Sequence, residues 1–74
     1  MMNKLQKLMV TFNERHHSLV KDGYLDVINT NRNDFVYVKM YHPNGNYVSL
    51  TAYVDNCEIV QRTNGVITHE EKVC

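Results

Sequence analysis

The amino-acid sequence predicts an α+β fold, in which an N-terminal amphipathic helix packs on one face of an antiparallel meander sheet of four or five strands. Two observations support this prediction. Apolar residues recur at three- and four-residue spacing over residues 3–21, and the period changes to two after Gly23. Short connections rich in Asn, Gly, Asp and Pro separate the strand-like segments, which favours antiparallel neighbours. At 74 residues, the chain is expected to form a single domain, 1–74.

The helix is predicted over residues 3–21, with a stripe of apolar side chains along one face. Asn3 is suited to cap its N-terminus, because an Asn side chain accepts a hydrogen bond from a backbone N–H of the first turn. Gly23 suits the left-handed position that commonly follows a helix. The apolar stripe consists of Leu5, Leu8, Met9, Phe12, Leu19 and Val20.

The sheet is predicted over residues 24–73, where apolar and polar residues alternate. Turn-forming residues bound each segment, and β-branched and aromatic residues are frequent within the segments. The predicted strands are residues 24–30, 35–41, 47–54, 57–63 and 66–73.

Turn chemistry predicts the register of the central hairpin. A three-residue loop, 43–45, would pair His42 with Asn46 and place Gly45 in a left-handed bulge position. A two-residue loop is the alternative, but it would turn Val48 toward the tyrosines, since a slip of one residue exchanges the two faces of a strand. We therefore favour the three-residue loop.

The outer registers follow from the same reasoning. A four-residue loop, 31–34, would pair Val27 with Val38 and set Asp26 opposite Lys39 as a pair of opposite charges. It would also pair Leu25 with Met40. A turn at residues 55–56 would pair Ala52 with Ile59. The last hairpin allows two or three loop residues around Asn64 and Gly65, and three are favoured because Ile67 and Val73 then point inward.

These registers separate two faces of the sheet. The inward face, which is expected to seat the helix, consists of Leu25, Val27, Val36, Val38, Met40, Val48, Leu50, Ala52, Val54, Cys57 and Ile59. The opposite surface of the sheet is called here the tyrosine face. It is expected to carry all five tyrosines and Phe35, in rows with Ile28, Thr51, Val60, Ser49, Arg62, Asp26, Thr30 and Glu58.

The tyrosine face is the candidate partner-binding surface. One helix cannot cover both faces of a sheet, and tyrosines are enriched at interfaces because each ring has an apolar body and a polar tip. The alternative is that the aromatic residues are there only for their β-propensity. The candidate binding residues are Tyr24, Phe35, Tyr37, Lys39, Tyr41, Tyr47 and Tyr53, with Tyr37 and Tyr41 as the central anchors.

Charge argues against nucleic acid as the partner. The net charge is zero and the pI is about 6.9, whereas nucleic-acid binders usually present a basic face. Lys39 and Arg62 are the only basic residues expected on the tyrosine face, beside Asp26 and Glu58. A nucleotide or single-stranded nucleic-acid binder that stacks bases on exposed aromatic rings is kept as a lesser alternative.

The sequence carries no recognisable catalytic or metal-binding pattern. Neither C-x₂-C nor H-x₃-H spacing occurs among its histidines and cysteines. Cys57 and His69 are at most marginal neighbours in the predicted register, and a buried Cys57 thiol would be inert. No phosphate-binding glycine loop or nucleophile elbow occurs. We therefore expect a protein that is not an enzyme and needs no cofactor or metal.

Localisation and setting are predicted from composition. The N-terminus lacks the apolar core of a signal peptide, and no apolar run is long enough for a membrane span, so a cytoplasmic protein with free Cys57 and Cys74 thiols is expected. Asparagine occurs nine times and alanine once, as in AT-rich genomes. This pattern favours a phage or mobile-element accessory protein that inhibits or modulates a protein or defence complex of its bacterial host. A self-assembling homo-oligomeric subunit, such as a homodimer, is the alternative.

Overall fold

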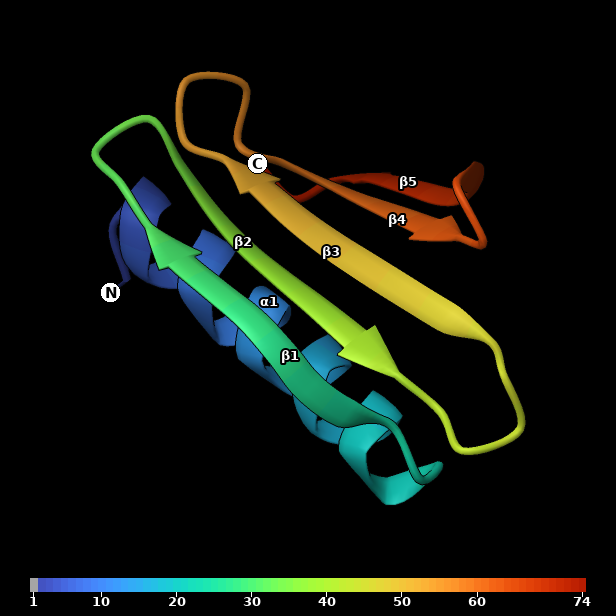
Figure 1. Cartoon of the computed structure of the whole chain (residues 1–74). Helices are drawn as coiled ribbons and strands as arrows, with labels where there is room; N and C mark the ends of the chain where they lie inside the picture. Colours follow the sequence, from blue (N-terminus) through green and yellow to red (C-terminus); the bar gives the residue numbers. More distant parts are fainter. Residues whose placement is uncertain (1) are drawn as a thin grey trace.

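The computed structural model describes residues 2–74 and shows one helix packed against an antiparallel sheet of five strands, as the sequence predicts (Figure 1). The strands follow one another as neighbours in chain order, β1-β2-β3-β4-β5, and the sheet is not closed. The elements are α1 (Lys4–Lys21), β1 (Leu25–Asn31), β2 (Phe35–Tyr41), β3 (Tyr47–Tyr53), β4 (Glu58–Thr63) and β5 (Val66–Lys72). No helix of residues 2–74 has the length and apolar character needed to cross a membrane.

Both ends of α1 are capped as the sequence predicts. The Asn3 side chain accepts a hydrogen bond from the Gln6 backbone N–H, and the Gln6 side chain accepts one from the Asn3 backbone N–H. This reciprocal capping box satisfies two donors that the first helical turn leaves free. Gly23 follows the helix at φ +101°, a conformation that costs glycine little.

The core lies between α1 and the inward face of the sheet. Leu8 and Phe12 are the two buried helix residues, and the helix packs chiefly on β3 and β4. Beneath them, every second residue of the central strands is buried, which is the alternation expected of a sheet with one covered face. The buried core residues are Leu8, Phe12, Val36, Val38, Met40, Leu50, Ala52, Cys57 and Ile59.

The central registers agree with the sequence prediction. The N–H of His42 donates to the carbonyl of Asn46, and Gly45 has φ +100°, so the loop contains three residues, 43–45. Val48 consequently points inward and is 2% exposed. On the other side of β3, Ala52 is paired with Ile59, which also confirms the predicted turn at residues 55–56.

The predicted register of β1 is wrong because the strand contains a bulge. Asp26 is paired with Met40 and Ile28 with Lys39, so Val27 is an extra residue without a Cα partner. An extra residue bends a strand and re-aims its side chains. Leu25 and Val27 are therefore 61% and 59% exposed instead of lying in the core. Asp26 does not face Lys39.

The predicted length of the last hairpin loop, three residues, is also wrong. Asn64 and Gly65, at φ +52° and +85°, form a two-residue loop, and Thr63 is paired with Val66. The register then shifts between Ile67 and His69, which are paired with Arg62 and Gln61. As a result Ile67 points to the tyrosine face and is 48% exposed. Beyond the shift, Val73 does pack against the core, as predicted.

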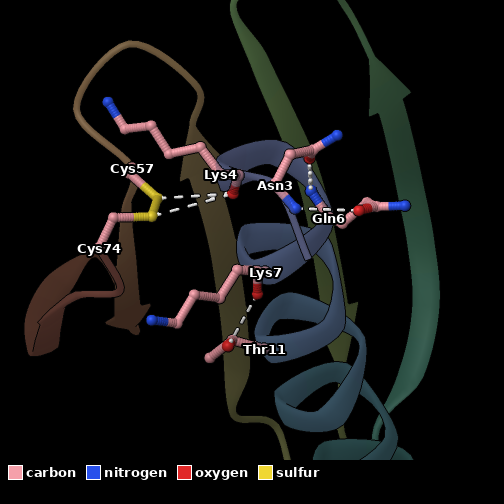
Figure 2. The surroundings of a disulfide bond; sticks show 7 residues. All are labelled: Asn3, Lys4, Gln6, Lys7, Thr11, Cys57 and Cys74. Carbon is pink, nitrogen blue, oxygen red and sulfur yellow. Dashed lines mark hydrogen bonds between the residues drawn. A yellow bond between two sulfur atoms is a disulfide. The ribbon is translucent and has the colours of Figure 1, made fainter. Parts of the chain in front are cut away.

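A disulfide joins Cys57 to Cys74, so the prediction of free thiols is wrong (Figure 2). The N–H of Val73 donates to the carbonyl of Cys57, which brings the next residue, Cys74, beside it. Cys57 is buried at 1% exposure, as predicted, and both sulfurs lie under 4 Å from the Lys4 carbonyl oxygen at the start of α1. The free thiols were expected as a consequence of a cytoplasmic location, and that location stays a prediction.

Candidate protein-binding face

The tyrosine face is built from the outward residues of β2, β3 and β4. Paired residues of neighbouring strands lie side by side, so the face consists of rows that run across the strands. The rows are Tyr41 and Tyr47; Lys39, Ser49 and Arg62; Tyr37, Thr51 and Val60; and Phe35, Tyr53 and Glu58. These are the groupings that the sequence predicts for the three central strands.

The edge strands add residues that differ from the prediction. Ile28 and Thr30 lie on the tyrosine face as predicted, but in the rows of Lys39 and Tyr37. Leu25 is new to the face, because the β1 bulge moves it outward into the row of Tyr41. At the other edge, Ile67 joins the row of Arg62. Asp26 leaves the tyrosine face and contacts the helix residue His16, with 2.8 Å between Oδ1 and Nε2.

Tyr24 also lies elsewhere than predicted. Its ring packs edge-on against the His42 ring, with 5.0 Å between centroids, and it lies against the helix-side core. The reason is that Tyr24 precedes β1 and belongs to the turn that leaves α1. Tyr24 therefore supports the fold next to Gly23, and the other predicted residues of the site remain together on the tyrosine face.

Exposure is uneven along the tyrosine face. Its centre is covered, since Thr51 and Val60 are only 5% and 6% exposed beneath larger neighbouring side chains. Phe35, Tyr37 and Tyr53 are half-buried. Tyr41 and Tyr47, at the end nearest the 43–45 loop, are the accessible rings, with 46% and 39% exposure.

These accessible rings belong to an apolar surface that we call the end patch, defined by Leu25, Ile28, Lys39, Tyr41 and Tyr47. Its two aliphatic members are 61% and 46% exposed. The ammonium of Lys39 lies 5.2 Å from the centre of the Tyr47 ring, within the range of a cation–π contact. This contact holds the lysine stem against the ring and leaves a positive charge at the middle of an apolar surface.

The rest of the face has mixed charge. Lys39 and Arg62 share one row, while Glu70 lies in the row of Val60 and Glu58 in the row of Tyr53. Lys72 is paired with Glu58 at the edge. The tyrosine face therefore carries charged groups of both signs.

A polar cluster that the sequence did not predict holds α1 to the edge strand β5. Arg15 contacts Glu71 on β5 at 2.6 Å, and this hydrogen bond is the main reason why the pKa of Glu71 is lowered from its ordinary 4.5. His69 lies 3.5 Å from the same carboxylate. Only the correct β5 register, with Glu71 opposite Ile59, could have revealed this cluster.

The Arg15–Glu71 pair also borders a cavity of about 250 Å³ between α1 and the β4–β5 hairpin. Six of its seven lining residues are polar or charged, and its one positive charge, Arg15, is already paired with Glu71. The lining residues are Thr11, Glu14, Arg15, Ser18, Leu19, Gln61 and Glu71. Because the positive charge of the cavity is already paired, this cavity offers a ligand less than the end patch does.

No family model matches this chain, and no curated protein or solved structure shows significant similarity to it.

Proposed function

We propose that this chain is a non-enzymatic protein-binding module and that the tyrosine face, through its end patch, contacts the partner. The observation that carries this proposal is the exposure of Tyr41 and Tyr47 beside Leu25 and Ile28, on the side of the sheet opposite α1. Contiguous apolar surface that the fold leaves exposed is a common mark of a binding site.

The end patch has the composition of an interface hot spot. Tyrosine is enriched among residues that dominate binding energy, because it buries a large ring with few rotatable bonds and keeps a hydroxyl for hydrogen bonding. Tyr41 and Tyr47 are directly opposite each other on β2 and β3, so one partner side chain can contact both. Lys39 adds one positive charge, which favours a partner that carries a carboxylate next to an apolar group.

A protein partner fits this surface better than a nucleic acid. Nucleic-acid affinity comes largely from contacts between basic side chains and phosphates. Here the two basic residues of the central rows, Lys39 and Arg62, share the tyrosine face with Glu70 and Glu58, which lie in the next two rows. The mixed charge would weaken phosphate binding, while the apolar end patch would still be buried by a protein.

The proposal includes a biological setting that rests on composition alone. An accessory protein of a phage or mobile element that inhibits or modulates a host protein or defence complex would need a rigid surface and no chemistry of its own. The nine asparagines and single alanine are the observation behind this setting. Self-assembly through the tyrosine face is the competing use of the same surface.

The test uses a double variant, Tyr41→Ala with Tyr47→Ala. After a partner has been captured from a bacterial lysate and identified, its purified form is titrated with each variant by calorimetry. The double variant should bind about 30-fold more weakly, which corresponds to ~2 kcal/mol, and it should keep its circular dichroism spectrum.

The matched control is Asn13→Ala with His17→Ala, two exposed positions on α1. This control should bind like the original chain. The proposal is wrong if the helix pair abolishes binding and the tyrosine pair does not. Self-assembly through the tyrosine face would instead appear in light scattering as an oligomer that the tyrosine pair dissociates.

A further inference from the structure

The two edges of the sheet differ in how well they are protected from further strand pairing. The β5 edge carries four consecutive ionisable residues, 69–72, which is a common defence against edge-to-edge association. The β1 edge carries a single one, Asp26, and its carboxylate is already bound to His16 at 2.8 Å. Its exposed Leu25, Val27 and Ile28 leave the β1 edge apolar.

The backbone of β1 also has hydrogen-bonding groups directed away from the sheet. The N–H of Arg32 donates to the carbonyl of Phe35, so this pair bonds across to β2. In an antiparallel ladder the bonding residues alternate, so Thr30 and Ile28 also bond inward. Asn29 and Asn31 therefore direct their N–H and C=O groups outward, and within residues 2–74 no strand pairs with this edge.

We propose that the β1 edge pairs with the β1 edge of a second copy of this chain, antiparallel and about a two-fold axis at Asn29. A two-fold interface brings the same residues of both copies together, so each Asn29 donates to and accepts from its counterpart. Ile28 of one copy then lies opposite Thr30 of the other. Both residues belong to the tyrosine face, so their side chains meet on that side of the joined sheet.

Charge identifies the second copy as the occupant. The chain has no net charge, so two copies do not repel each other at long range. Asp26 is the single ionisable residue within the approaching strands, and it is paired within its own copy. A β5–β5 pairing would instead bring together two segments that each contain Glu70 and Glu71.

The resulting dimer has a consequence for the proposed binding surface. An axis perpendicular to the joined sheet leaves both helices on one side and both tyrosine faces on the other. The two end patches, which contain Leu25 and Ile28 from β1 itself, then belong to one continuous surface. This inference stands apart from the proposed function, because the edge and the rings are altered by different variants.

Sedimentation velocity over a range of concentrations tests the inference, with Asn29→Pro and Thr30→Lys as variants, neither of which lies in the end patch. Proline removes the outward N–H of Asn29 without breaking a bond to β2, and the lysine introduces a charge next to the axis. Each variant should raise the dimer dissociation constant at least tenfold. Glu70→Pro is the matched control, since Glu70 occupies the equivalent outward position on β5, and it should leave the dimer unchanged.

Hydrogen exchange on the unaltered chain provides a measurement that does not depend on a variant folding. The amides of Asn29 and Asn31 should exchange more slowly as the concentration rises, while the amide of Glu70 should not change. A chain that stays monomeric at every concentration overturns the inference. So does a dimer that survives both β1 variants or dissociates only with Tyr41→Ala and Tyr47→Ala.

Discussion

Arg15 and Glu71 join the middle of α1 to β5, with the guanidinium Nη2 2.6 Å and Nε 2.8 Å from the same carboxylate oxygen. The next helix residue, His16, contacts Asp26 on β1 at 2.8 Å. Adjacent helix residues point about 100° apart, which is why two successive side chains can reach opposite edges of the sheet. The helix is thus held at both sides by polar contacts as well as from below by the core.

The Glu71 contact predicts a specific pH dependence. A folded-state pKa below the ordinary 4.5 means that the ionised carboxylate stabilises the fold above 4.5 and that this contribution is lost as the pH falls through the lowered pKa. Glu71→Gln should therefore lower the free energy of unfolding by less than ~1 kcal/mol at neutral pH, because the pair is a third exposed. Urea titrations should show that this difference shrinks below pH 4.5. A difference that stays constant down to pH 2, or one that Glu70→Gln reproduces, would contradict the prediction.

Two glycines with the same φ should respond differently to alanine. Gly45 has φ +100°, and a Cβ at this position would have no atom within 4 Å. Gly45→Ala should therefore lower the free energy of unfolding by about 1 kcal/mol through backbone strain alone. At Gly23, φ +101°, the Cβ would lie 2.9 Å from the His42 Nε2, which contacts the Asp22 carbonyl. Gly23→Ala should therefore have the lower urea midpoint. Equal midpoints would show that the His42 ring moves aside freely.

Removal of the disulfide should lower the free energy of unfolding, because the unfolded chain without the bond has more conformational entropy. The bond spans a sequence separation of 17 residues, for which loop-closure entropy predicts a loss of about 3 kcal/mol in Cys74→Ser. The control is a reductant, in which the original chain and the variant should have the same urea midpoint. A thiol assay of the native, non-reduced chain should detect no reactive thiol. Two thiols titrating under those conditions would mean that the bond is absent in solution.

Two leucines on α1 form a matched pair for the core. Leu8 is 1% exposed against the sheet, so Leu8→Ala should lose about 2–5 kcal/mol, since removed contacts and a residual cavity both contribute. Leu5, one turn earlier, is 51% exposed, and Leu5→Ala should stay within about 1 kcal/mol. Chemical denaturation measures both. Similar losses at the two positions would show that α1 is seated with a different face on the sheet.

The sequence was sufficient to predict the registers and the two faces of the central strands. The loop at residues 43–45 has a proline and a glycine at positions that only one turn geometry accommodates well, and the two faces of β2, β3 and β4 follow from it. Within these three strands, the predicted rows of Tyr37, Tyr41, Tyr47 and Tyr53 are consequently the observed ones. Helix capping by Asn3 was equally readable from local chemistry.

The edge strands were not predictable in the same way, because each contains a register shift that no glycine or proline marks. The extra Val27 reverses the faces at the start of β1, and the shift in β5 follows Ile67. The disulfide was missed because free thiols were expected in a cytoplasmic protein, and the second register error also hid the proximity of the two cysteines. In the favoured register Cys57 faces Glu71, whereas the observed register brings Val73 beside Cys57 and places Cys74 next to it.

The alternation along β2 and β3 divides each strand into two independent sets of positions. Val38, Met40 and Leu50 specify the fold from one side, while Lys39, Tyr41 and Tyr47 lie on the other side and contribute little to the core. Mutational drift or a combinatorial library could therefore change the second set extensively while the first keeps the scaffold intact. By this reasoning the chain is a template on which new recognition specificities can be selected, provided that the covered Thr51 and Val60 are kept.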